Sequence, residues 1–437
     1  MRKTQLAIAL AAFGVASGAH ATNGMNIEGF GPIAAAMGGA SMAYDNGNAA
    51  MMNNPATLGL AADGNRLDVA IGFLGPDVKN ETVGMTSGGD SYIMPAIGWT
   101  KKSGKLSYGV GMFAQGGMGT EFASSLVGDG RPERSELGVG RLMAPVTYNV
   151  NDKLTVAGSI DFVWAMLDIK MAMSGAQFGG LVTVPPSGAI GGVLAALGPT
   201  EDARLEFSDD SDYTGEAKGT GFAGKLGFTY KMSPTVTLGG SYHSKTNLGD
   251  METGANGATL FADLNNDGSY VVADGEVAPG KIIVRDFQWP ETYGLGVSVQ
   301  ATPTLMVAAD WKRINWKDVM ANFTMTYEAF GDSVTFALPQ NWDNQDVFAI
   351  GLAYKASNAL TLRAGASFSE NPIPDSTMHY LFPAIIENHY TVGFGYGFSD
   401  TSEVNFSLQY APEVKQTNGV TVSHSQTSWQ LMYSKRF

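Results

Sequence analysis

Between Tyr390 and Phe398 every second residue is large and apolar, and the residues between them are threonine or glycine. A period of two with one apolar face predicts a β-strand. The second face of this strand is small or weakly polar, and the same pattern returns in many segments of the chain. Strands of this kind suit a barrel whose outer surface contacts lipid and whose interior is polar or hollow.

Alternation of this type fixes the expected architecture. Short turns such as Asn151-Asp152 and Ser399-Asp400 separate some neighbouring segments, whereas others are joined by long connections. Short periplasmic turns and long extracellular loops are typical of outer-membrane barrels. We therefore predict an all-β fold, a transmembrane antiparallel barrel of about 14 strands over residues 65–437. Long extracellular loops are expected at about 171–216 and 246–284.

The N-terminus has the pattern of a secretory signal peptide. Arg2 and Lys3 precede an apolar run from Leu6 to Ala16, and Ala19-His20-Ala21 follows as a small-x-small cleavage site. We predict that residues 1–21 form a cleaved signal peptide. The alternative is a buried N-terminal helix.

The C-terminus favours the outer membrane over the periplasm or secretion. Trp429, Leu431, Tyr433 and Phe437 share one strand face, and Phe437 is the last residue. A terminal aromatic residue that closes an alternating strand is similar to the C-terminal signal of bacterial outer-membrane barrels, although Lys435 departs from it. We expect the cell outer membrane as location, with its lipids and the outer-membrane assembly machinery as partners.

The charge of the chain excludes one class of partner. The formal net charge is −14, and removal of residues 1–21 with their two basic residues changes it to 25 − 41 = −16. Nucleic-acid binding requires a basic surface, so no nucleic-acid partner is expected. No mature segment has the about 18 consecutive apolar residues that a transmembrane helix needs.

Residues 22–64 do not alternate and are rich in Gly, Ala, Met and Asn. A segment of this size is too small to bury a core of its own. We predict a hatch, or plug, packed inside the barrel; a disordered periplasmic tail is the alternative.

The hatch segment resembles that of a known family. Gly38-Gly39-Ala40 and Asn53-Asn54-Pro55-Ala56-Thr57-Leu58 are similar to the N-terminal hatch of the FadL family (OmpP1/FadL/TodX) of outer-membrane transporters for long-chain fatty acids or other hydrophobic compounds. Further similar stretches are Trp289-Pro290-Glu291, Asn371-Pro372-Ile373-Pro374-Asp375 and Phe382-Pro383-Ala384, so the resemblance extends over the mature chain.

The resemblance implies a 14-stranded barrel with a periplasmic hatch and a strand kink that opens a side exit toward the bilayer. It also implies a ligand groove between two extracellular loops, here about 171–216 and 246–284. Asn54, Pro55 and Ala56 would then belong to the gating element, although an ordinary turn at Pro55 is the alternative. In the stretch Ala165–Met173, where fatty-acid members carry basic residues, only Lys170 is basic.

Candidate ligand contacts fall into two groups. Methionine is flexible and polarizable and suits a path for varied apolar solutes, which makes Met166, Met171, Met173 and also Leu194 candidates, with simple core packing as the alternative. The cations Lys170, Lys225, Lys312 and Arg363 are candidates for holding a carboxylate. The alternative for the cations is an internal salt network such as Asp310–Arg363.

A stretch from residue 263 to residue 274 begins like a calcium-binding loop. Asp263, Asn265, Asp267, Ser269 and Asp274 occupy positions 1, 3, 5, 7 and 12, and position 12 is normally Glu. A structural Ca²⁺ in the second long loop is a hypothesis, with an acidic turn as the alternative. No other cofactor is expected.

Nothing in the sequence indicates catalysis, because no GxSxG, HExxH or cysteine site is present. His243-Ser244 is the single candidate pair for a barrel enzyme, and a rim position is its alternative. The sequence therefore predicts a passive channel for hydrophobic molecules, with long-chain fatty acids first and aromatic or alkane hydrocarbons second. A structural or adhesive barrel is the alternative.

Overall fold

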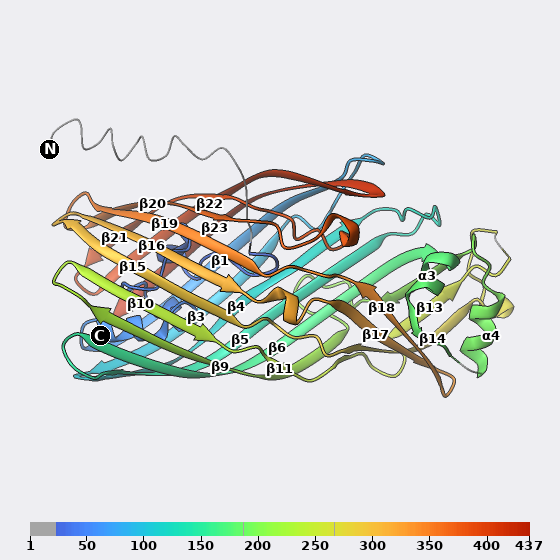
Figure 1. Cartoon of the computed structure of the whole chain (residues 1–437), viewed down its shortest axis with the longest axis horizontal. Coiled ribbons are helices and arrows are strands. Elements are labelled where there is room, and N and C mark those ends of the chain that lie inside the picture. The colour runs from blue at the N-terminus through green and yellow to red at the C-terminus, as the bar shows by residue number, and fades with distance from the viewer. Residues whose placement is uncertain (1–22, 187, 266) are drawn as a thin grey trace.

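The computed structural model describes residues 23–186, 188–265 and 267–437, so the predicted signal peptide lies outside the described residues. One antiparallel sheet closes on itself because its first and last strands pair, from Arg66 opposite Arg436 to Asn80 opposite Val422. Figure 1 shows the long strands running obliquely along the barrel. In order around the ring they are β1 (Gly64–Asn80), β3 (Tyr92–Ser103), β4 (Leu106–Phe122), β5 (Glu133–Asn149), β6 (Leu154–Ser174), β9 (Ala217–Lys231), β10 (Val236–His243), β15 (Thr292–Thr302), β16 (Leu305–Ile314), β19 (Gln345–Lys355), β20 (Leu360–Ser369), β21 (His389–Ser399), β22 (Ser402–Asn418) and β23 (Val420–Arg436).

The prediction of about 14 strands is wrong for this sheet, which has 23 strands among the described residues. The additional strands lie in stretches without clear alternation, several of which the sequence pattern assigned to loops. They are β2 (Met85–Thr86), β7 (Val182–Val184), β8 (Asp202–Phe207), β11 (Asn247–Leu248), β12 (Met251–Glu252), β13 (Ala258–Ala262), β14 (Val277–Arg285), β17 (Asn322–Ala329) and β18 (Asp332–Pro339).

Several of these strands extend the sheet beyond the ring at the long-loop end. The upper part of β6 pairs with β8, and the pairing continues through β13, β14, β17 and β18 to β7. Helices α3 (Gly175–Leu181) and α4 (Gly188–Ala196) lie at the right-hand end of this extension in Figure 1. Helix α4 is apolar around its whole circumference and buries only Ile190 fully.

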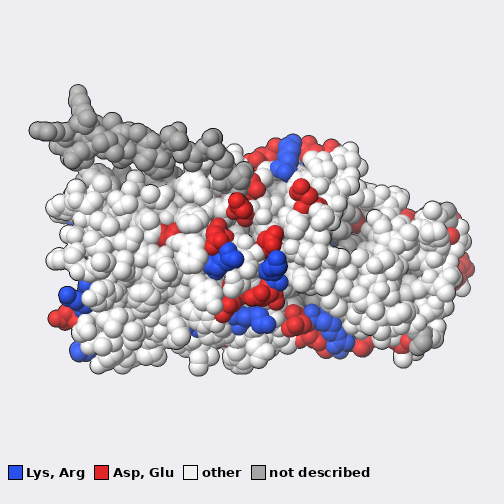
Figure 2. Space-filling model, in the orientation of Figure 1, with Lys and Arg blue, Asp and Glu red and all other residues white. Residues whose placement is uncertain are grey.

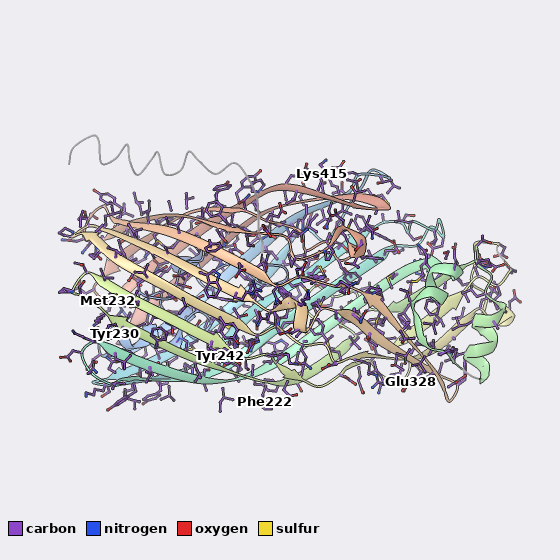
Figure 3. The ribbon with its side chains drawn as sticks, viewed as in Figure 1. Phe222, Tyr230, Met232, Tyr242, Glu328 and Lys415 are labelled. Carbon is purple, nitrogen blue, oxygen red and sulfur yellow. The ribbon has the colours of Figure 1, made fainter. Side chains whose placement is uncertain are left out.

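The outer face of the ring is apolar. Successive side chains of a strand point to opposite faces, so the large apolar residues at every second position lie together on one face. Phe222 and Leu226 on β9 are 59% and 60% exposed, and Tyr230 follows on the same face. Figure 3 labels Phe222 at the lower edge of the barrel and Tyr230 near its left-hand end. Such exposure of large apolar side chains is stable only against an apolar environment.

Charged side chains are unevenly distributed along the barrel. On the face shown in Figure 2, the left-hand part is almost free of them, and Asp, Glu, Lys and Arg gather in a band near the middle. The uncharged zone coincides with the strands that bear the exposed apolar residues. This distribution is expected of a barrel whose uncharged part is embedded in lipid. Among the described residues, no helix has both the length and the apolarity to span a bilayer.

The segment before β1 fills the bore near the short-turn end. It contains α2 (Pro32–Ala35) and the 3₁₀ helices η1 (Asn48–Met51) and η2 (Pro55–Leu60). Gly38 has a positive φ, and a Cβ there would lie 2.4 Å from the carbonyl oxygen of Ala366 on β20. Only glycine permits so close an approach between the hatch and the wall. Three more short 3₁₀ helices, η3 (Val272–Asp274), η4 (Trp316–Asp318) and η5 (Asp375–Thr377), lie in the long connections.

Candidate functional site

The wall of the barrel is interrupted between β3 and β4. Strand β3 pairs with β1 up to Tyr92, but its pairing with β4 stops at Ile97 opposite Met112. Strand β4 continues to Phe122 and pairs there only with β5. A bulge between Ala114 and Gly116 bends β4 at this point. Residues 92–96 of β3 and the part of β4 that follows Met112 therefore do not pair with each other.

The first described residues of the hatch lie against this open edge. The backbone N–H of Gly117 donates to the carbonyl of Met25 (3.0 Å), and that of Ile27 donates to the carbonyl of Gln115 (3.4 Å). Asn26 forms an isolated bridge with Gly116. The hatch thus satisfies backbone groups that the wall leaves unpaired.

A cavity of about 360 Å³ lies beside the interruption, which is within the about 300–1,000 Å³ of small-molecule sites. Its lining is mostly apolar and includes Phe113, Leu137, Val139, Trp164 and Met166. Its polar lining residues are Asn26, Glu28, Tyr92, Glu136, Asp212, Tyr213, His424 and Gln426. No lysine or arginine is among the described residues that line it.

A smaller cavity of about 40 Å³ adjoins the first one. The two share the lining residues Ile27, Met94, Pro95, Phe113 and Ala114. The smaller cavity is also lined by Ile71 and Ile97, whose side chains are exposed on the outer face of the barrel. The chain of cavities therefore leads from the interior to the region of the wall where β3 and β4 separate.

A loop over residues 208–216, called here the 208–216 loop, closes the cavity toward the long-loop end. Asp212 and Tyr213 of this loop line the cavity, and Tyr213 is 64% exposed on its other side. Asp168 anchors the loop because its carboxylate accepts from the Ser208 hydroxyl (2.9 Å) and from the Glu216 N–H (2.6 Å).

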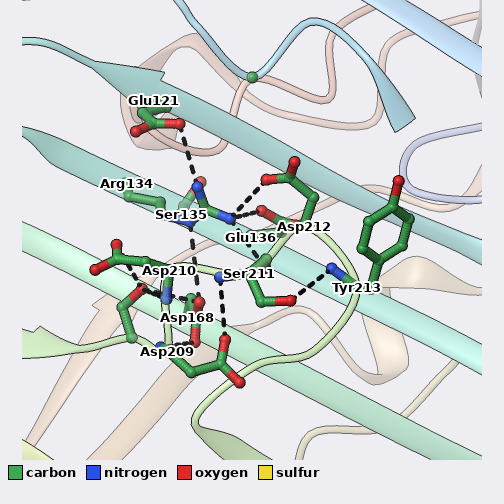
Figure 4. Close-up of polar contacts among 12 residues, drawn as sticks. Glu121, Arg134, Ser135, Glu136, Asp168, Asp209, Asp210, Ser211, Asp212 and Tyr213 are labelled. Carbon is green, nitrogen blue, oxygen red and sulfur yellow. Dashed lines mark hydrogen bonds and ion pairs between the residues drawn. The ribbon is translucent and has the colours of Figure 1, made fainter. Parts of the chain in front are cut away.

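Arg134 is the second anchor of the 208–216 loop (Figure 4). Its guanidinium donates to Asp212 Oδ1 (3.2 Å) and to the carbonyl of Ser211 (3.0 Å). The same group also forms ion pairs with Glu121 (3.1 Å) and Glu136. A planar guanidinium can hold several acceptors at once in this way. One buried arginine thus connects β4, β5 and the loop that covers the cavity.

The predicted cations bind the protein itself. Lys225 donates to the carbonyl of Met52, and Lys312 donates to the carbonyls of Glu28 (3.1 Å) and Gly39 (2.9 Å). Arg363 donates to Asn405 Oδ1 (2.9 Å), and Lys170 pairs with Asp210 in the 208–216 loop. Each of these cations already has a partner in the fold, and none of them lines the cavity.

Asp310 completes the attachment of the hatch from β16. Its carboxylate accepts from the backbone N–H groups of Ser41 (2.5 Å) and Met42 (3.0 Å). The alternative prediction is an internal salt network between Asp310 and Arg363. Among the described residues, these two side chains do not form an ion pair. Lys225, Lys312 and Asp310 hold hatch backbone groups, whereas Arg363 binds Asn405.

The predicted gating residues Asn54, Pro55 and Ala56 form the start of η2. The Asn54 side chain caps the helix through the Ala56 N–H (3.1 Å) and donates to the carbonyls of Met42 (2.7 Å) and Phe228 (2.9 Å). Pro55 occupies the first helical position, and its carbonyl accepts from Thr147 (2.8 Å). These contacts join the hatch to β5 and β9; whether the element moves stays a prediction.

Of the predicted apolar contacts, Met166 lines the cavity, whereas the others do not. Met171 and Met173 are buried in the apolar core that continues into the long-loop extension, and Leu194 on α4 packs against the same core. The alternation of apolar residues along β6 does not reveal where on this strand the cavity ends. Met166 is thus the one of these four residues placed to touch a solute there.

The calcium-type loop is tied together by its own hydrogen bonds. Asp263 accepts from the N–H groups of Asp267 (3.2 Å) and Gly268 (2.8 Å), and Asp267 accepts from Ser269. Asn265 also accepts from the Asp267 N–H (3.0 Å), and Asp274 lies in η3. Among the described residues, no three His, Cys, Asp or Glu side chains converge as metal ligands. Calcium binding stays a prediction.

His243 and Ser244 do not form a catalytic pair. His243 Nε2 lies 2.9 Å from Asp161 Oδ2, while the Ser244 hydroxyl accepts from the Gly224 N–H (2.9 Å). Asp161 also pairs with Arg141 (3.3 Å) in the interior. The histidine therefore belongs to a buried charge cluster of the lumen.

Sequence reasoning missed Glu28, Arg134, Glu136, Asp212, His424 and Gln426. The last two could have been found, because His424, Gln426, Ser428 and Gln430 lie on the strand face opposite to Trp429, Leu431 and Tyr433. That period places the polar set inside the barrel. No comparable signal connects Arg134 with a loop about 78 residues away in sequence.

Comparison with known proteins identifies the family. The family model described as outer membrane protein transport protein (OMPP1/FadL/TodX) matches residues 8–433. The chain belongs to this family. It is accordingly an outer-membrane β-barrel channel for hydrophobic compounds, and the proteins of the FadL/TodX family are transport channels rather than enzymes.

Solved structures of the FadL/TodX family resemble the chain over almost their whole length. The Pseudomonas putida toluene transporter TodX is 30% identical with a TM-score of 0.81, covering 94% of this chain and 99% of that one. The Ralstonia pickettii toluene transporter TbuX is also 30% identical, with a TM-score of 0.78 and the same coverage. A Pseudomonas aeruginosa FadL homologue is 14% identical with a TM-score of 0.73, covering 95% of this chain and 100% of that one, and this similarity shows the fold alone.

One curated relative was found by sequence. An uncharacterized protein in the phosphoenolpyruvate carboxykinase gene 5′ region of Chlorobium limicola is 44% identical over 99 residues, which are 22% of this chain and 49% of that protein. The chain thus spans about half the length of the curated relative that it matches.

Proposed function

We propose that this channel takes up small neutral hydrophobic molecules, with monoaromatic hydrocarbons as the first candidates and long-chain fatty acids as the second. The observation that carries the proposal is the charge of the cavity lining. Glu28, Glu136 and Asp212 contribute carboxylates, and no described lining residue is a lysine or arginine. An anionic head group would lose its water there without gaining a cationic partner, which is costly.

The apolar side of the cavity supports the same choice. Trp164 and Phe113 offer aromatic faces, and Met166 adds a polarizable thioether. Burial of apolar area contributes roughly 25 cal/mol per Å². The resemblance to proteins named as toluene transporters also favours hydrocarbons over fatty acids.

The proposed route follows the chain of cavities. A solute enters past the 208–216 loop, occupies the cavity, and leaves through the wall where β3 and β4 are unpaired. The hatch is held to the wall by Lys225, Lys312 and Asp310, and by the bond from its own Asn54 to the Phe228 carbonyl. A side exit requires none of these bonds to break.

The test is uptake of labelled toluene and labelled oleate by cells with and without the protein. We expect the protein to accelerate toluene uptake more than oleate uptake. Gly138→Phe should abolish the toluene effect, because Gly138 lines the cavity and the nearest atom to an added Cβ is 3.6 Å away. Gly180→Phe on α3 is the matched control, since a Cβ there meets nothing within 4 Å. If the protein accelerates neither solute, a structural or adhesive barrel is the better description.

A further inference from the structure

Two polar side chains interrupt the apolar lining of the cavity. His424 and Gln426 are two residues apart on β23 and therefore share its inner face. Both line the cavity, and they are only 9% and 5% exposed. A buried polar group without a hydrogen-bond partner is destabilising, so the hydrogen bonds that these two side chains can form decide what the cavity binds.

The hydrogen bonds of His424 define its free nitrogen. Nδ1 lies 2.8 Å from the carbonyl oxygen of Pro383, which can only accept. The proton of the neutral ring is therefore on Nδ1, and Nε2 is left as an acceptor. Nε2 is buried and has no hydrogen-bond partner among the described residues.

Gln426 supplies the complementary group. Its Nε2 is a donor that is likewise buried and without a partner within the described chain. Residues two apart on a strand are separated by about 6–7 Å along its axis. A single oxygen between the two side chains can then lie about 3 Å from each nitrogen, which is hydrogen-bonding distance.

We propose that His424 and Gln426 bind the hydroxyl group of a hydroxylated hydrophobic solute, with phenols as the class. This inference rests on the proposed function, because it concerns a solute in the same cavity. A hydroxyl donates to His424 Nε2 and accepts from Gln426 Nε2, and so uses both free groups. A hydrocarbon uses neither. A carboxylate only accepts, and it would place a negative charge beside the lone pair of Nε2.

The two residues are then the specificity determinants of the channel. A site that hydrogen-bonds a hydroxyl discriminates against the analogue that lacks it, because its own polar groups would stay unpaired. The ring of the solute would lie toward Trp164, Leu137 and Val139, on the apolar lining. In the absence of a solute, a water molecule can occupy the position of the hydroxyl.

The experiment compares p-cresol with p-xylene, which differ by a hydroxyl in place of a methyl group. Binding to the purified full-length protein in detergent is measured by titration calorimetry, with each Kd corrected for partition of the solute into detergent micelles. We expect p-cresol to bind at least fivefold more tightly than p-xylene. His424→Phe and Gln426→Met should each remove this preference, with the Kd for p-xylene unchanged within twofold.

Two further variants keep the test decisive. His424→Asn retains a donor for the Pro383 carbonyl but has no acceptor in place of Nε2, so it should lose the preference even if His424→Phe does not fold. Gln300→Met removes an exposed amide near the short-turn end and should change nothing.

The outcomes separate the two proposals. Equal binding of both solutes to the native protein, or an equal loss of both in the variants, overturns the role of the pair and leaves it as a structural or water-binding feature. Binding of neither solute contradicts the proposed function itself.

Discussion

The ammonium group of Lys312 on β16 lies 2.9 Å from the backbone carbonyl of Gly39 in the hatch. Lys225 makes the same kind of bond from β9 to the carbonyl of Met52. Both lysines are almost completely buried. These two basic residues of the wall thus bind the hatch, and their replacement should first change the stability of the hatch.

We expect Lys312→Met to loosen the hatch without unfolding the barrel. The Glu28 carbonyl would lose its bond from Lys312, and the Gly39 carbonyl would keep only its bond from the Ser41 hydroxyl. An unpaired buried carbonyl costs about 1–3 kcal/mol, so amide hydrogen exchange in residues 38–54 should accelerate about tenfold or more. Lys153→Met in an exposed short turn is the control. Unchanged exchange in the hatch would show that the bond contributes nothing to its attachment.

The 208–216 loop should open more often when Arg134 is replaced. The chain has no cysteine, so Val139→Cys introduces a single thiol into the cavity. In this background Arg134→Gln should raise the rate of thiol modification by a small neutral reagent about fivefold, corresponding to about 1 kcal/mol.

Two comparisons check that interpretation. In 1 M salt, where the Debye length is about 3 Å, the difference between Arg134→Gln and the native residue should shrink. Arg313→Gln breaks an exposed ion pair with Asp346 and should leave the rate unaltered. A rate that does not respond to Arg134→Gln argues against the loop as the cover of the cavity.

Acid should loosen the segment before β21 through His379. The ring stacks on Tyr380 (centroids 4.8 Å apart) and contacts Phe382 (5.6 Å), and burial lowers the pKa of His379 to about 4. Below the unfolded-state pKa of about 6.5, the unfolded segment binds a proton that the folded one excludes. The stabilisation is therefore complete above about pH 6.5 and is lost as the pH falls toward 4.

We expect protease cleavage of residues 375–388 to rise between pH 6.5 and pH 4.5. His379→Gln keeps an acceptor for the Leu381 N–H (3.2 Å in the native protein) but does not titrate, and it should flatten this rise. Burial raises the pKa of Glu387 to about 7, which acts in the opposite direction, so the comparison between variant and native protein isolates the histidine. Identical pH profiles would contradict the assignment.

Removal of divalent metal tests the loop at residues 263–274. Because Asp263 and Asp267 already accept hydrogen bonds within the loop, we expect the same protease pattern with calcium and with a chelator. Protection by calcium that is lost in Asp263→Asn would instead establish the site that the sequence pattern suggested.

The alternation of strands such as Tyr390–Phe398 could be read directly, because lipid outside and a polar bore inside impose a period of two. The short strands of the extension could not, since β8 and β13 pair with each other over only a few residues and depend on tertiary partners. Met166 and Met171 show the same limit within one strand. Met166 is half-buried and Met171 is buried, and only the three-dimensional path of β6 shows that Met166 lines the cavity.

The cations illustrate a second limit. The period of the strands places Lys225 and Lys312 on the inner face, but it does not tell what they meet there. Their partners are backbone carbonyls of a segment more than 170 residues away. Every residue has a backbone carbonyl, so no pattern of side chains in the sequence predicts which carbonyls these lysines bind.

The pairing of β1 with β23 bears on the order of assembly. Strand β23, which completes the cylinder by pairing with β1, follows all the other described strands in the chain, so the two free edges can join only after β23 has been synthesised. The hatch precedes β1 and is enclosed by all the later strands. It must therefore already be inside, or be threaded inside, when the last seam forms, and a variant that delays its packing should accumulate as an unclosed intermediate.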